Sequence, residues 1–199
     1  MGAVIRWVSA IWVALLLSAC STTFQPAHVD PATGRFATQD PIDKVETELP
    51  FEARYSDLLY VMTDSKIESF NEFFIQSFTS MGSFNSVVGK DKLETLVIQK
   101  NLSDKVPSVS DMVGLNRLSK EIGPFLVVEP SVVFLGGYQF EASLKVTDAS
   151  TGNVVLKITN AATNWAGLDK PLFYPLFNAF LDWTKGRPIL TAAATQRTH

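Results

Sequence analysis

The chain has 199 residues, with 17 lysines and arginines against 20 aspartates and glutamates and a formal net charge of −3. No run of basic residues marks a surface for nucleic acid, so nucleic-acid binding is not expected. The single cysteine, Cys20, and the two histidines, His28 and His199, lie outside the central part of the sequence. Disulfides, imidazole-dependent triads and histidine- or cysteine-based zinc sites are therefore not expected in the folded part. We expect no metal ion and no cofactor.

The first apolar segment has the order of a secretory signal peptide. Arg6 is followed by an apolar stretch over residues 7–17 and then by small residues. The stretch is shorter than the roughly 20 residues that a membrane-spanning helix needs. Leu17-Ser18-Ala19-Cys20 resembles the signal of bacterial lipoproteins, which implies cleavage between Ala19 and Cys20 and acyl chains such as palmitate on Cys20. An ordinary secretory signal with an incidental cysteine is the alternative.

The residues after the cysteine bear on location and reach. In lipoproteins of this type an aspartate after the cysteine favours retention in the inner membrane, and Ser21 stands there instead. We therefore expect attachment to the outer membrane, facing the periplasm. Residues 20–43 contain Pro26, Pro31 and Pro41 with little apolar periodicity, which predicts a lipidated cysteine followed by a flexible tether.

Residues 44–186 are predicted to form one periplasmic α/β domain, and residues 187–199 a disordered tail. Ser65 and Glu68 form a capping box, and an apolar stripe follows at helical spacing until Gly82. Ser108 or Ser110 is predicted to cap a later helix. The first elements expected in chain order are an extended segment within 45–62, a helix to residue 81, a short strand over 84–88, a helix over 91–99 and a helix over 112–122.

Three strands are predicted next. The apolar run over 125–135 is typical of a strand covered on both faces, although Pro130 requires a bulge or a free edge. Residues 138–147 alternate between apolar and polar, and the alternation resumes at Val154 after a short turn. These segments predict an antiparallel meander.

The last helix, starting at residue 169 or 170 and ending near 185, has more apolar residues than one buried face requires. Asn178, Asp182 and Thr184 form its polar side. One interpretation is a helix wedged between the sheet and another helix. The other is an exposed aromatic patch that binds a partner protein, made of Trp165, Tyr174, Phe177 and Trp183.

The predicted fold is a mixed sheet of about five strands, ending in the three-strand meander and packed with about four helices. Three short segments in this order carry a resemblance: Met81-Gly82-Ser83-Phe84 with Val87-Val88, Glu121-Ile122-Gly123, and Thr147-Asp148 through Thr151-Gly152-Asn153-Val154-Val155. The chain resembles the periplasmic module of the TolB amino-terminal domain, CsgG and LpoB. The resemblance implies a lipoprotein that works through protein contacts. The predicted turns are too short for the membrane strands of a CsgG-type pore.

Three hypotheses on function follow. The first is a non-catalytic, lipid-anchored protein that binds envelope machinery, either to regulate a cell-wall synthase or to support secretion or surface assembly; homo-oligomers are compatible with it. The second is a carboxylate-dependent hydrolase of envelope polymers, with Glu129 and Glu141 as the acid–base pair. The third is a carrier of a small apolar ligand, which requires a large apolar cavity.

Overall fold

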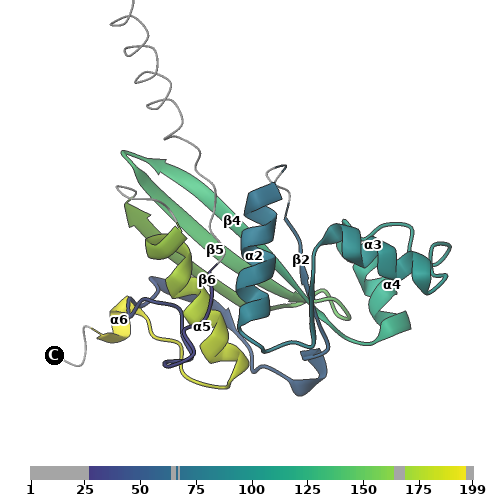
Figure 1. Ribbon diagram of the computed structural model, residues 1–199, viewed down its shortest axis with the longest axis horizontal. Helices are drawn as coiled ribbons and strands as arrows, with labels where there is room; N and C mark the ends of the chain where they lie inside the picture. Colours follow the sequence, from purple (N-terminus) through teal and green to yellow (C-terminus); the bar gives the residue numbers. More distant parts are fainter. Residues whose placement is uncertain (1–26, 64–65, 67, 164–168, 196–199) are drawn as a thin grey trace, which may run out of the picture.

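The computed structural model describes residues 27–63, 66, 68–163 and 169–195. They form a single α/β domain around one mixed sheet of six strands (Figure 1), which confirms the predicted fold class. The sheet has the order β1-β6-β5-β4-β2-β3. Its elements are β1 (Lys44–Glu48), the 3-10 turn η2 (Ala53–Tyr55), β2 (Leu58–Val61), α2 (Glu68–Ser80), β3 (Ser86–Val88), α3 (Lys90–Gln99), α4 (Met112–Ile122), β4 (Leu126–Gly136), β5 (Gln139–Asp148), β6 (Val154–Thr163), the π-helical turn η3 (Asp169–Phe173), α5 (Tyr174–Thr184) and α6 (Ala192–Thr195).

The extra strand comes from the segment 45–62, which was expected to be one extended element. It divides into β1, which pairs antiparallel with β6, and β2, which pairs in parallel with β3 and β4. β4, β5 and β6 form the predicted antiparallel meander. α4 begins with Asp111, whose carboxylate accepts a hydrogen bond from the Gly114 N–H, and not with Ser108 or Ser110 as predicted.

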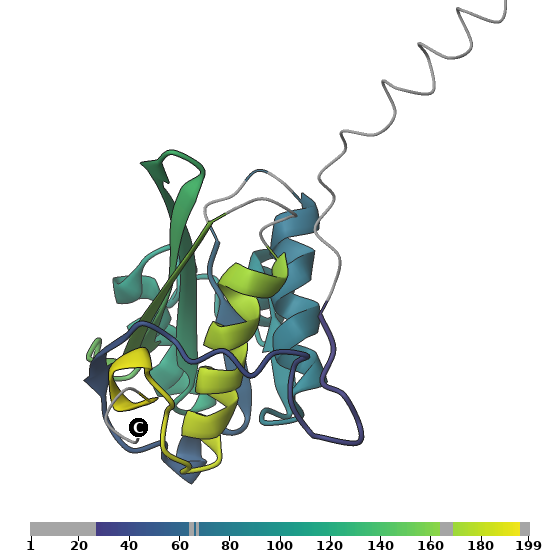
Figure 2. The ribbon, with the colours of Figure 1, turned by 90° about the vertical axis from the view of Figure 1, so that its left-hand side faces the viewer.

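The two faces of the sheet are covered differently (Figure 2). α2, η3 and α5 lie on one face, where Leu144, Val146 and Ile158 join their apolar side chains in the larger core cluster. α3 and α4 lie on the other face, and pack around Tyr60 and Val127 from the middle of the sheet. No helix among the described residues is long and apolar enough to cross a membrane.

The segment predicted as a flexible tether is in large part built into the domain. In its described residues, 27–43, the side chains of Ala27, Phe36 and Ile42 are buried in the larger core cluster. The backbone of Ile42 bridges to Thr191, so part of the segment predicted as a disordered tail is ordered as well. Both predictions were wrong for these residues because isolated apolar side chains, spaced too far apart for any periodicity, fill gaps in a core made by other elements.

The strand β4 is covered on both faces only in its first part. Residues 126–128 are buried and pair with β2, whereas the part after Pro130 has only β5 as a neighbour. The Val128 carbonyl accepts a hydrogen bond from the Met62 N–H on the β2 side. Because residues two apart point the same way, the proline nitrogen of Pro130 faces the free edge, where no amide hydrogen is needed.

Candidate functional site

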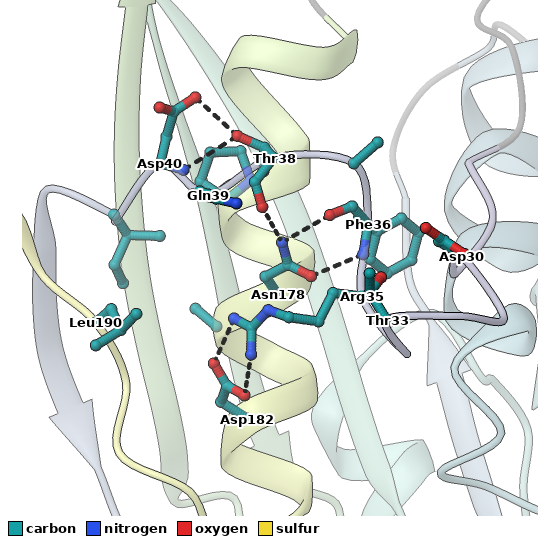
Figure 3. Close-up of a pocket in the computed structure, with 14 residues that line it drawn as sticks. Asp30, Thr33, Arg35, Phe36, Thr38, Gln39, Asp40, Asn178, Asp182 and Leu190 are labelled. Carbon is teal, nitrogen blue, oxygen red and sulfur yellow. Dashed lines mark hydrogen bonds and ion pairs between the residues drawn. The ribbon is translucent and has the colours of Figure 1, made fainter.

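A groove of about 720 Å³ lies between α5 and the segment over residues 30–42 (Figure 3). The segment crosses α5 and forms one wall of the groove, while α5 contributes the floor (Figure 3). The residues that line it are Asp30, Thr33, Arg35, Phe36, Ala37, Thr38, Gln39, Asp40, Ile42, Pro175, Asn178, Ala179, Asp182 and Leu190.

Asn178 fixes the wall to the helix by three hydrogen bonds. Its Oδ1 accepts from the Phe36 N–H at 2.9 Å, and its Nδ2 donates to the carbonyls of Phe36 and Thr38 at 3.1 and 3.2 Å. The side chain is buried, so the amide supplies partners to backbone groups that water does not reach. Asn178 thereby sets the backbone path of the wall.

Asp182, one turn further along α5, forms the second attachment. Its two carboxylate oxygens accept from the Arg35 guanidinium in a bidentate pair, both at 2.8 Å. Arg187 reaches the same carboxylate at 2.7 Å. The carboxylate is almost fully buried, whereas Arg35 and Arg187 keep a third or more of their side chains in solvent. Two guanidiniums therefore share one buried carboxylate. These ion pairs hold Arg35, which precedes α5 in the sequence, and Arg187, which follows it, against the helix.

The floor of the groove combines apolar and polar residues of α5, and its rim is polar. Ala179 and Pro175 lie at the floor, and Leu190 closes one side with half of its side chain exposed. Gln39 and Asp40 are exposed at the rim. The lining residues include no histidine, cysteine or lysine. This arrangement suits the binding of an extended segment, with side chains against the floor and polar groups at the rim.

The structure corrects the exposed aromatic patch. Phe177 is fully buried and Trp183 is 2% exposed, while Tyr174 is half-buried. Phe177 contacts the rings of Phe36 and Phe73, and the Trp183 Nε1–H donates to the Leu49 carbonyl at 2.7 Å. Trp165 lies outside the described residues, as do Ala19 and Cys20. α5 is packed between the sheet and α2, which agrees with the interpretation of a wedged helix.

The sequence analysis missed the groove, although its signal was present. Asn178 and Asp182 were assigned to the polar side of the last helix, and both are buried. Two polar residues four apart on a helix that is apolar around most of its circumference indicate polar partners within the fold. Arg187 is a local partner of Asp182, but Arg35 and Phe36 lie more than 140 residues away in the sequence, and nothing local identifies them.

The proposed acid–base pair is not formed. Glu129 pairs across the strands with Lys145, with 2.8 Å between the Lys145 Nζ and the Glu129 Oε1. Glu141 lies four residues from Lys145 on the same face of β5, about 13 Å away at the rise of a strand. In glycosidases the two carboxyl groups lie at most about 9.5 Å apart. Here the backbone positions of Glu129 and Glu141 are farther apart than that, and the Glu129 carboxylate is held by Lys145. The hypothesis was wrong because the strand register, which the sequence does not reveal, separates the two carboxylates.

A second polar cluster lies at the other end of β5. The Tyr55 hydroxyl donates to the Asp148 carboxylate at 3.0 Å, and Asp148 also accepts from the N–H and hydroxyl of Ser150. Burial and the bond to Asp148 raise the pKa of Tyr55 to about 12. Burial opposes ionisation of Asp148, but the hydrogen bonds from Ser150 and Tyr55 outweigh it and hold the pKa of Asp148 below its ordinary value. The cluster thus fastens η2 to the turn after β5, and its phenol stays protonated at neutral pH.

Metal-binding groups do not come together in the described residues: among them, no three histidine, cysteine, aspartate or glutamate side chains are placed to hold an ion.

Comparisons with known proteins give a weak likeness. No family model and no curated relative matches the chain. The solved structures it is similar to include the LpoB C-terminal domain from Salmonella enterica (14% identity, 58% of this chain and 88% of that chain, TM-score 0.36). They also include the PelC dodecamer from Paraburkholderia phytofirmans (15% identity, 71% of this chain and 96% of that chain, TM-score 0.38). A third is the lipoprotein GNA1162 from Neisseria meningitidis (12% identity, 55% of this chain and 81% of that chain, TM-score 0.34). TM-scores at this level carry no argument about what this chain binds.

Proposed function

We propose that this chain is a non-catalytic lipoprotein, anchored through Cys20 to the periplasmic face of the outer membrane, that binds a segment of another envelope protein. The partner belongs to a cell-wall synthase or to a secretion or surface-assembly machine. The observation that carries the binding part is the groove between α5 and residues 30–42, where Pro175, Ala179 and Leu190 supply apolar surface below a polar rim. The anchor is supported by Leu17-Ser18-Ala19-Cys20.

The groove is suited to an extended peptide because its wall is already held in place. Asn178 and the Arg35–Asp182 pair fix the backbone of the wall before any partner arrives. A preformed site saves the entropy that a loop would lose on ordering, so more of the contact energy appears as affinity.

The alternatives have less support. A hydrolase with the pair proposed above would need Glu129 and Glu141 close together, and the register separates them. A carrier of an apolar ligand needs an enclosed apolar cavity, whereas the groove is partly open and its lining includes Asp30, Arg35, Asp40 and Asp182.

Site-directed photocrosslinking in the native envelope tests the binding function. A photoreactive residue at Gln39, on the rim, is expected to form an adduct with a discrete protein, and one at Ile98 is not. Ile98 serves as the matched control because it is an exposed residue on α3, outside the groove.

A substitution in the groove makes the result specific. Leu190→Asp places a charge on the exposed side of the groove and is expected to abolish the Gln39 adduct without unfolding the domain. The matched change Ile98→Asp is expected to leave the adduct unchanged. Equal adducts from both probe positions, or an adduct that survives Leu190→Asp, would contradict the proposal.

A further inference from the structure

The turn of the β4–β5 hairpin lies at one end of the domain, beyond the ends of the helices α2 and α5 (Figures 1 and 2). The residues on either side of this turn have exposed apolar side chains. The exposed fractions are 53% for Val133, 62% for Phe134, 54% for Leu135 and 65% for Tyr138. A cluster of large apolar side chains at one projecting tip is typical of a surface that contacts a protein or a membrane. A single exposed apolar residue is common on protein surfaces and does not indicate such a contact.

Tyr138 adds a conformational argument. It has a φ of +65° in the turn Gly136-Gly137-Tyr138, a conformation that bulky side chains rarely adopt. Glycine or asparagine would fit there with less strain. Tyr138 is 65% exposed, and an amphipathic ring of this kind is suited to a membrane–water interface.

The direction of the amino-terminal segment indicates which end of the domain faces the anchor. The Ala27 N–H donates to the Ser77 hydroxyl and the Val29 N–H to the Ser80 hydroxyl, so the segment runs in the same direction as α2. Its upstream end points toward Glu68, where α2 begins. α2 starts just after β2, and β2 is parallel to β4, so that end of the domain is also the hairpin end.

The chain between Cys20 and the domain is short. Six residues lie between Cys20 and Ala27, and the seven steps from one Cα to the next span at most about 25 Å. The helical rise from Ser77 back to Glu68 is about 13 Å, so the anchor reaches the hairpin end. A lipid surface that holds Cys20 is therefore within reach of the projecting tip.

We propose that the tip of the β4–β5 hairpin is a second membrane contact, which places Val133, Phe134, Leu135 and Tyr138 in the lipid leaflet that holds the anchor. The proposal rests on the lipidation of Cys20 proposed above. Residues 131–141 contain no lysine or arginine, so the contact depends on burial of apolar area and not on attraction to anionic lipid. The contact fixes the orientation of the domain on the membrane.

Lipid quenching of a probe on the full, lipidated protein tests this. With Cys20 acylated, Leu135→Cys creates the only free thiol, which takes an environment-sensitive fluorophore. The labelled protein is reconstituted into vesicles of phosphatidylethanolamine and phosphatidylglycerol at about 3:1 that contain spin-labelled lipid. Val113→Cys is the matched control, since Val113 is as exposed but lies on α4, away from the hairpin.

The expected result is flotation of the protein with the vesicles, with a blue shift and strong quenching at position 135 and neither at position 113. Phe134→Ser together with Tyr138→Ser is expected to lower the fraction of probe in lipid by roughly tenfold. Flotation with the 135 probe still in water overturns the tip contact while leaving the anchor in place. Shielding of the probe by a second copy of the chain, seen as a blue shift without lipid quenching and as a 135–135 disulfide in the unlabelled Leu135→Cys protein, also overturns it. A protein that does not float overturns both the anchor and the tip contact.

Discussion

Replacement of Asn178 by leucine is expected to loosen the wall of the groove and to destabilise the domain. Leucine has a similar volume but cannot form the three hydrogen bonds to the backbone of Phe36 and Thr38. At about 0.5–1.5 kcal/mol for each bond, the free energy of unfolding should fall by about 2 to 4 kcal/mol. The Phe36 N–H loses its acceptor in a buried position, which places the result in the upper part of that range.

Urea unfolding measures the loss, and hydrogen exchange at the Phe36 amide locates it. Exchange at Phe36 should accelerate more than global unfolding does, because the wall detaches before the rest of the domain opens. Asn116→Leu is the control: its Nδ2 also donates to two backbone carbonyls, those of Ala149 and Ser150, but away from the groove. That variant should lose stability without selective exchange at Phe36. An Asn178→Leu protein within 0.5 kcal/mol of the original, with Phe36 still protected, would refute this account of the groove.

Three further outcomes follow from the packing and the charges. Phe177→Ala removes a fully buried ring and should lower the free energy of unfolding by about 3 to 5 kcal/mol in chemical denaturation, whereas an exposed patch would lose little. Folding raises the pKa of Tyr55 from 10 to about 12, so the stability that Tyr55 contributes is complete below pH 10 and is lost as the pH rises from 10 to 12. Tyr55→Phe should therefore flatten the plot of unfolding free energy against pH in that range. An unchanged plot would contradict the hydrogen bond to Asp148. Gly114→Ala should lower the melting temperature markedly in calorimetry, because the added Cβ would overlap the backbone carbonyl oxygen of Ser108. An unchanged melting temperature would contradict this close contact between Gly114 and Ser108.

The elements that the sequence predicted best are those whose pattern is local. The alternation in residues 138–147 and 154–158 predicted two strands of the meander, and both form. The apolar spacing up to Gly82 predicted α2, which ends at Ser80 with Gly82 at a φ of +62°. Such patterns are read within one element and need no knowledge of its neighbours.

The groove could not be predicted because it depends on contacts between distant segments. Phe36 and Ile42 are single apolar residues in a polar stretch, and no period shows that they enter the core. The buried amide of Asn178 gives a partial signal, but the identity of its backbone partners is a tertiary fact. Sequence periodicity thus located α5 but did not show that residues 30–42 pack over it.

The hairpin tip was misjudged for a related reason. An apolar run is compatible with a strand buried on both faces and with one that projects beyond its neighbours. The run that includes Phe134 continues past the last residue of β4 that pairs with β2, so its apolar side chains become exposed. How far a strand extends past its neighbours depends on the register, which the run itself does not encode.

Mass spectrometry of the amino-terminal peptide of the protein extracted from its native membrane tests the central claim most directly. The account predicts a peptide that begins at Cys20 and carries a diacylglyceryl thioether on sulfur and an acyl chain on the new amino group. A peptide that begins upstream of Cys20, or one with a free thiol at Cys20, would contradict the anchor and with it the membrane contact of the hairpin tip.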